Sequence, residues 1–164
     1  KATLYSKPGR NNPAFVMAKQ LHGTLPVVYS SSDILDTVNL RWRGQMHENA
    51  KQLAFGNLVP EMNHNEINSW SNPPEIVRQT SLVLLRDADE HERVAVRFEA
   101  MKSLIGKKAK NLVEARGEGE HLLTRMITLL YLGDWMSYYL ALLNGVDPTE
   151  IPLIMKLKQR LASV

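Results

Sequence analysis

The stretch TSLVLLRD, residues 80–87, decides the fold. Its four central residues are all apolar, so an extended chain here would present apolar side chains on both faces. Strands of this kind are typical of parallel sheets, in which helices cover both faces. Helical segments are therefore expected on either side of this strand along the chain.

Strand and helix patterns alternate outward from this segment. Further strands are predicted at LPVVYSS (25–31), NLVPEM (57–62) and KNLVEARG (110–117). Helices are predicted at 12–23, Asp33–Phe55, 90–106, 119–143 and from Pro148 to the end of the chain. This order predicts one α/β domain over residues 1–164, a three-layer sandwich in which helices flank a parallel sheet of about four to five strands.

The composition narrows the classes of function. The net charge is only +3 and no run of Lys and Arg alternates with aromatic residues, so no nucleic-acid partner is expected. The chain has no cysteine, which is compatible with a cytoplasmic protein. The most apolar stretch, residues 122–143, contains the charged residues Arg125 and Asp134. These charges favour a helix buried in the protein core over a membrane span, so no membrane partner is expected. The chain begins with Lys1 rather than Met, so a fragment of a longer protein is expected.

The helix expected at Asp33–Phe55 has an apolar face and a polar stripe beside it. The apolar face consists of Val38, Trp42, Met46 and Leu53. The polar stripe consists of Arg41, Gln45, Glu48 and Gln52. Such a stripe is found where a helix borders a cleft, but it also suits a solvated edge, and the pattern alone favours the solvated edge.

The last helix carries a lysine on its apolar side. Its apolar face is formed by Ile151, Ile154, Leu157 and Leu161. Lys158 projects from the middle of that face, whereas Lys156 points to the opposite side. Lys158 must therefore either extend its ammonium group to water or reach an anionic partner, and the helical spacing leaves both interpretations open.

The polar stretch PEMNHNEINSW, residues 60–70, places His64 between two asparagines after an expected strand. In parallel sheets, ligands bind beyond the carboxyl ends of the strands, and His64 lies at one of them. The imidazole suits a structural role, a metal site with His47, Glu61 or Glu66, or acid/base catalysis near neutral pH. No HExxH spacing supports a metal, and no metal is expected. The chain also lacks the G-x-S-x-G, G-x-G-x-x-G and G-x-x-x-x-G-K-[ST] motifs.

Two segments together resemble a known family. RWRGQMHENAK (41–51) followed by PEMNHNEINSW resembles the C-terminal sugar isomerase (SIS) domain of the bifunctional phosphoglucose/phosphomannose isomerases. The resemblance extends over nearly the whole chain, through NPAFVMAKQLHGTLPVVYSS (12–31) and GDWMSYYLALLNGVDPTEIPLIMKLKQRL (133–161). It implies an SIS-type sandwich, and it implies isomerisation of glucose 6-phosphate to fructose 6-phosphate, with mannose 6-phosphate as an additional candidate substrate.

The resemblance also implies roles for individual residues. Glu48 corresponds to the base that moves a proton between C2 and C1 through a cis-enediol, and His64 to the histidine that opens the sugar ring. The lysine near the end of the family's chain, which helps to stabilise oxygen charge, corresponds most naturally to Lys158, with Lys156 as the competing position. From their positions rather than from the resemblance, Arg41 and Gln45, beside Glu48, and Asn63, beside His64, are expected to contact the substrate. The reaction needs neither a metal nor an organic cofactor.

The family resemblance further implies a partner subunit and a further SIS domain outside this sequence. In this superfamily the histidine reaches the active site of the neighbouring subunit, which implies a homodimer. Family members contain two SIS domains, and the Ser/Thr loop that binds the phosphate lies in the first, whereas this chain resembles only the second. Ser30–Ser32 follow a strand as such a loop does, but they equally suit the start of the next helix. The chain is therefore expected to be inactive alone.

The alternative functions are a non-catalytic sugar-phosphate-binding module and a dimerisation domain.

Overall fold

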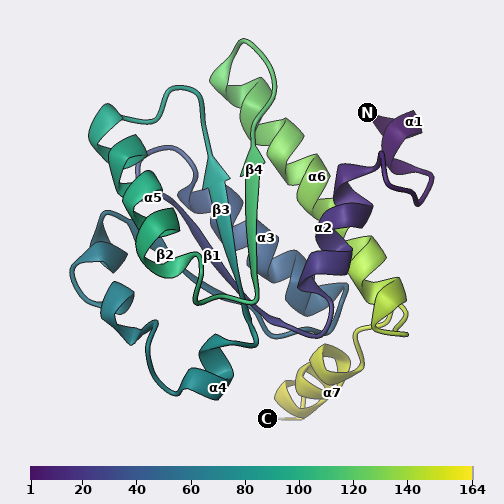
Figure 1. The fold of residues 1–164 in the computed structure, drawn as a ribbon. Coiled ribbons are helices and arrows are strands. Elements are labelled where there is room, and N and C mark those ends of the chain that lie inside the picture. Colours follow the sequence, from purple (N-terminus) through teal and green to yellow (C-terminus); the bar gives the residue numbers. More distant parts are fainter. Residues whose placement is uncertain (164) are drawn as a thin grey trace.

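The computed structural model describes residues 1–163 and confirms the α/β sandwich (Figure 1). Its sheet has four parallel strands in the order β2-β1-β3-β4. The strands are β1 (Leu25–Ser31), β2 (Phe55–Val59), β3 (Thr80–Arg86) and β4 (Asn111–Arg116). Every residue of β3 is buried, as its continuous apolar run predicts for a central strand.

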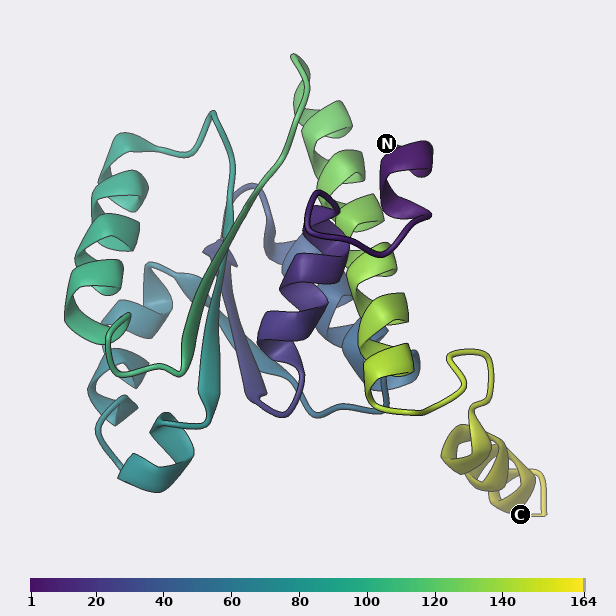
Figure 2. The ribbon, with the colours of Figure 1, turned by 45° about the vertical axis from the view of Figure 1, so that its right-hand side comes forward.

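Helices cover both faces of the sheet (Figure 2). One face packs against α2 (Pro13–Leu21), α3 (Asp36–Glu48) and α6 (Leu122–Leu143), and Val83 and Leu85 of β3 point into that core. The other face packs against α5 (Glu92–Ile105), and Leu82 and Leu84 belong to that second core. α6 has the length and composition of a membrane span, but nine of its residues are buried in the domain, as expected of a core helix.

Short helices complete the chain. α1 (Ala2–Tyr5) precedes α2, whose first turn is capped by the side chain of Asn12 accepting a hydrogen bond from Phe15 N. The connection from β2 to β3 contains the 3₁₀ turns η1 (Glu61–Asn63) and η2 (Glu66–Ser69) and the short helix α4 (Pro74–Val77). The chain ends with α7 (Pro152–Leu161).

The structure corrects the prediction of a helix over Asp33–Phe55. Val38, Trp42 and Met46 are fully buried as predicted, but α3 begins at Asp36 and ends at Glu48. The helix ends there because Lys51 adopts φ 51°, a left-handed conformation that a helix cannot continue through. Leu53 is consequently 67% exposed instead of lying on the buried face.

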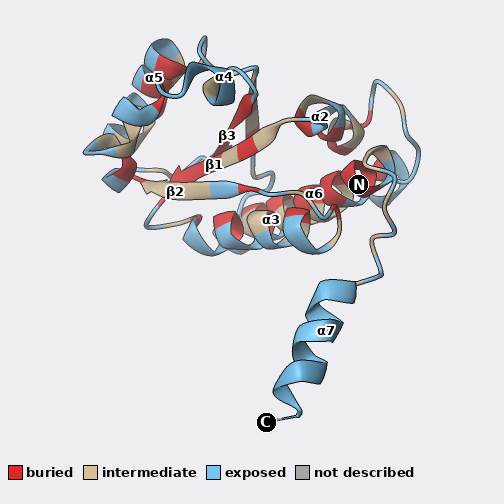
Figure 3. Ribbon diagram, turned by 90° about the horizontal axis from the view of Figure 1, so that it is seen from below, coloured by how far each residue is buried: buried red, intermediate tan, exposed pale blue. Residues whose placement is uncertain are grey.

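The ends of other elements also differ from the prediction: α6 begins at Leu122 rather than at residue 119, and the differences are larger for β2 and α7. β2 begins at Phe55 and ends at Val59, two residues earlier than predicted at its start and three at its end, because residues 61–63 form the turn η1. α7 covers only part of the helix predicted from Pro148 to Val164, and Val164 lies outside the described residues. Among the described residues α7 contributes no buried side chain, and Figure 3 shows it extending away from the body of the domain.

Candidate functional site

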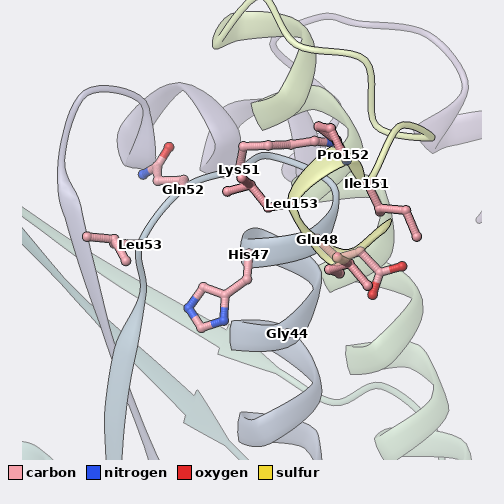
Figure 4. A pocket seen from close by; sticks show the side chains of 10 residues that line it. Gly44, His47, Glu48, Lys51, Gln52, Leu53, Ile151, Pro152 and Leu153 are labelled. Carbon is pink, nitrogen blue, oxygen red and sulfur yellow. The ribbon is translucent and has the colours of Figure 1, made fainter. Parts of the chain in front are cut away.

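Glu48 lies at the amino-terminal edge of the sheet. α3 follows β1 and runs back antiparallel to the strands, so its last turn reaches the edge where the strands begin. A hollow of about 490 Å³ opens there, lined by Gly44, His47 and Glu48 on one side and by residues 151–154 on the other. Figure 4 shows Glu48 beside Ile151, whereas the ring of His47 points away from both. Within the described residues the Glu48 carboxylate has no hydrogen bond or ion pair, and it is exposed.

The loop after Glu48 is fixed by α6 and by the linker that follows α6. Asn49 Nδ2 donates to Ser137 Oγ at 2.9 Å, and Asn144 Nδ2 donates to the carbonyl oxygen of Ala50 at 3.0 Å. Lys51 Nζ donates to the carbonyl oxygen of Asp147, which joins the loop to the linker leading into α7. The position of Glu48 is thus fixed by contacts with distant parts of the chain.

The other members of the predicted stripe bind elsewhere. Arg41 Nη2 lies 3.5 Å from Asp134 Oδ1 in α6, and Gln45 Nε2 donates to the same carboxylate. Gln52 lies beyond the helix and donates to the carbonyl oxygens of Leu21 and Thr24, each at 3.0 Å. Arg41 and Gln45 therefore join α3 to α6, and among the described residues neither forms a hydrogen bond or ion pair with Glu48.

His64 lies at the opposite edge of the sheet. β2 ends at Val59, opposite Ser31 of β1, and His64 follows directly after η1. Its backbone N–H donates to the Glu61 carbonyl oxygen at 3.0 Å, and its side chain is exposed. The neighbouring Asn63 has a buried side-chain oxygen without a hydrogen-bond partner among the described residues.

A buried polar cluster fixes the segment just after His64. The Tyr29 hydroxyl donates to Glu66 Oε1 at 2.5 Å and accepts from Trp70 Nε1 at 2.9 Å. Asn57 Nδ2 donates to the other oxygen of Glu66 at 2.8 Å. Burial and the hydrogen bond with Glu66 raise the pKa of Tyr29 far above its usual value, so the phenol stays protonated and donates. In the sequence, Glu66 stood out only as a possible metal ligand, and Tyr29 only as part of the strand predicted at residues 25–31.

Lys158 is separated from both residues within this chain. It is exposed on α7, four residues after Ile154, and therefore lies on the same side of the helix as Ile154. Ile154 lines the hollow beside Glu48, whereas Lys158 does not. The structure thus brings Glu48 close to the start of α7 but does not bring Lys158 to Glu48.

Charged side chains at the carboxyl end of β3 form ion pairs. Arg125 Nε lies 2.9 Å from Asp87 Oδ2, and Arg86 binds Glu90 and Glu99. Burial alone would raise the pKa of Asp87, but hydrogen bonds from Arg125 and from the backbone N–H of Asp89 outweigh it and lower that pKa. Since the buried arginines at this edge are paired, they are not available to hold a phosphate.

Ser30–Ser32, the stretch compared with a phosphate loop, also has a local role. Ser30 Oγ donates to the carbonyl oxygen of Leu35 at 3.2 Å and accepts from Asn39 Nδ2 at the same distance, so it fixes the turn into α3. Ser31 Oγ is buried without a hydrogen-bond partner among the described residues. Within residues 1–163 no group of three or more His, Asp or Glu side chains has a geometry that could hold a metal ion.

Comparison with known proteins adds independent information. Residues 10–161 match the family model described as the bacterial phospho-glucose isomerase C-terminal SIS domain. The chain is 36% identical over 157 residues to a bifunctional phosphoglucose/phosphomannose isomerase of Caldicellulosiruptor bescii, covering 96% of this chain and 46% of that protein. It is also 36% identical to the protein of the same name from Aquifex aeolicus, covering 88% of this chain and 45% of the relative.

A solved structure shows the same fold. The glucose-6-phosphate isomerase like protein from Thermus thermophilus matches with a TM-score of 0.74 and 25% identity, over 93% of this chain and 52% of that one. The chain therefore spans about half the length of the relatives that it matches.

Proposed function

The chain belongs to the bacterial phospho-glucose isomerase C-terminal SIS domain family, and on this basis we propose that it is the second half of an aldose–ketose isomerase acting on sugar phosphates. The proposed reaction interconverts glucose 6-phosphate and fructose 6-phosphate, with mannose 6-phosphate as a further substrate. The names of its relatives, phosphoglucose/phosphomannose isomerases, support this substrate class. The other half of the protein is proposed to hold the phosphate, so that this half alone does not turn over substrate.

The observation that carries the proposal is the position of Glu48 and His64. Both side chains are exposed, and they lie beyond opposite edges of the sheet. One chain therefore cannot place both on a single hexose, which is only a few ångströms long. Two copies arranged with twofold symmetry can do so, because the carboxylate of each copy then meets the imidazole of the other.

In the proposed mechanism His64 of the partner subunit acts first. It transfers a proton between the C1 hydroxyl and the ring oxygen, which breaks the C1–O5 bond and exposes the aldehyde. Glu48 then removes the proton from C2 while O1 takes up a proton, giving a cis-enediol. As the O2 hydroxyl gives up its proton, Glu48 returns the proton that it holds to C1, which forms the ketose. Lys158 is proposed to stabilise negative charge on the reacting oxygens. The contacts that fix the loop after Glu48 support this role, because proton abstraction needs a closely positioned base.

Mixed dimers of the full-length protein test the proposal. Glu48→Gln and His64→Ala variants are each expected to be nearly inactive in a coupled isomerase assay. Dissociated and reassociated at equal concentrations, they should recover about a quarter of the parental activity, because half of the dimers then contain one intact site. No recovery in verified mixed dimers would place the two residues in the same subunit's site. Sugar-phosphate binding without turnover in the unsubstituted full-length protein would indicate the non-catalytic alternative.

A further inference from the structure

α7 is an amphipathic helix whose apolar face is uncovered. Leu153, Leu157 and Leu161 are 78%, 57% and 66% exposed, although the spacing of the apolar residues is that of a packed helix. Figures 2 and 3 both show α7 standing clear of the sheet and of the other helices. An apolar stripe of this kind marks a contact surface for another part of the assembly.

The base of α7 is attached at the proposed active site. Ile151 and Ile154 line the hollow that also contains Glu48. The hydrogen bond from Lys51 to the Asp147 carbonyl oxygen holds the preceding linker against the loop after Glu48. The ten residues of α7 span about 15 Å, so whatever covers the helix must lie close to Glu48.

The charges of α7 complement those of the segment that carries His64. α7 contains Lys156, Lys158 and Arg160 and no acidic residue. The connection between β2 and β3, residues 60–79, is called here the His64 segment. It contains the acidic residues Glu61, Glu66 and Glu75 and, apart from His64, one basic residue, Arg78. A basic helix and an acidic segment attract one another, which supports this pairing.

We propose that α7 packs its apolar face on the His64 segment of a second copy of the chain. This inference rests on the proposed function, which requires the partner subunit's His64 to reach Glu48, where α7 begins. A partner in that position lies beside α7, and Lys158, on the apolar side of the helix, then faces its acidic segment. The packing also explains the place of Lys158 on the apolar side of α7, since it would bring Lys158 to the site shared by Glu48 and the partner's histidine.

Site-specific photo-crosslinking in the full-length protein tests which surface covers α7. A benzophenone amino acid at Leu157, on the apolar face, should give a covalent dimer whose crosslinked peptide maps to the His64 segment. The same probe at Gln159, on the opposite side of the helix, is the matched control and should give little dimer. Crosslinks confined to one chain, crosslinks to another surface of the partner, or equal yields from the two positions would each overturn the proposal.

A substitution pair gives a second measurement. Leu157→Glu should weaken dimerisation by about tenfold or more in analytical ultracentrifugation, whereas Gln159→Glu should leave it within about twofold. Neither change should lower the melting temperature of the monomer, because α7 buries no side chain in the described part of its own domain. An unchanged dissociation constant for Leu157→Glu would contradict the proposal. If the mixed dimers recover activity in that case, the proposed function stands and only the assignment of α7 fails.

Discussion

Glu48 and His64 lie beyond opposite edges of the same parallel sheet. Glu48 ends α3, which runs from the carboxyl end of β1 back to the edge where the strands begin. His64 follows η1, directly after the carboxyl end of β2. The thirteen residues of α3 cover about 20 Å, which indicates the scale of the separation. This relationship is the structural reason for proposing a site that is built from two subunits.

Substitution of Glu48 should remove turnover without affecting folding. Glu48→Gln keeps the size of the side chain but cannot accept a proton, so kcat should fall by about 10²–10⁴-fold, with KM changed much less. The melting temperature should be unchanged, because the carboxylate has no partner among the described residues. Glu120→Gln, on the exposed loop before α6, is the matched control and should keep parental activity. Parental turnover in Glu48→Gln would exclude Glu48 as the base.

Substitution of His64 should affect ring opening more than isomerisation. His64→Ala should lower the rate on glucose 6-phosphate by about 10²-fold or more, since the imidazole transfers protons in the ring-opening step. The loss should be much smaller on a shorter aldose phosphate that cannot close a stable ring. His121→Ala, at the exposed start of α6, controls for loss of an imidazole. Equal losses on both substrates would argue against a ring-opening role.

The hydroxyl of Tyr29 should stabilise the segment that carries His64. Tyr29→Phe leaves Glu66 Oε1 and Trp70 Nε1 without their partner, which should cost about 1–3 kcal/mol of unfolding free energy. Because Glu66 is only two residues from His64, the closed-ring rate should fall more than the open-chain rate. Urea denaturation and the two-substrate assay measure these effects. A destabilised variant with an unchanged ratio of the two rates would leave Tyr29 with a structural role only.

Much of the fold follows from local pattern, but the end of α3 does not. The continuous apolar run of β3 and the spacing of Val38, Trp42 and Met46 predicted buried positions that the structure confirms. The helix pattern continued past Glu48, yet the chain turns at Lys51. That turn is held by Asn144 and by the linker after α6, and contacts so distant in sequence leave no local signal.

Local pattern likewise predicts only part of the candidate site. The resemblance of two short segments to the family singled out Glu48 and His64 as candidates, which remain a prediction. The cluster of Tyr29, Glu66 and Trp70 depends on how residues 66–70 return across the sheet, which local pattern does not specify. The separation of Glu48 from His64, in contrast, follows from topology alone. A helix that follows a parallel strand ends at the edge opposite to the strand's carboxyl end, so the predicted order of elements already implied it.

Stability should fall in acid through Asp87. Hydrogen bonds from Arg125 and from Asp89 N lower its pKa despite burial, so its ionised form favours the folded state. That contribution is fully present above the pKa of the unfolded residue, about 3.9, and is lost as the pH falls through the lower folded value. Asp87→Asn leaves Arg125 with one charged partner fewer in a buried position and should cost about 3–5 kcal/mol at pH 7.

Urea midpoints between pH 2 and pH 7 test this account of Asp87. The difference between the parental protein and Asp87→Asn should be constant near neutrality and shrink in acid. A difference that stays constant throughout this range would show that the charge of Asp87 does not contribute to stability. Asp36→Asn, an exposed position in the first turn of α3, serves as the control for a change of carboxylate to amide.

Substitution of Gly44 by alanine tests whether a second copy of the chain packs against α3. It lies inside the helix, one turn before Glu48, and a Cβ added there would meet no atom of the described chain within 4 Å. Alanine should therefore stabilise the monomeric domain by about 0.5–1 kcal/mol, because glycine is unfavourable inside a helix. If a partner packs on the hollow beside Glu48, the added methyl group should instead weaken dimerisation and lower kcat/KM in the full-length protein.

The contrasting substitution is Gly133→Ala, whose Cβ would lie 2.6 Å from Trp42 Nε1 within the same chain. It should destabilise the monomer by about 1–3 kcal/mol through overpacking between α3 and α6. Thermal unfolding of the isolated domain and sedimentation of the full-length protein separate the two effects. A Gly44→Ala protein with higher monomer stability and an unchanged dimerisation constant would show that the surface around Gly44 is not an interface. The site would then have to be completed from another direction.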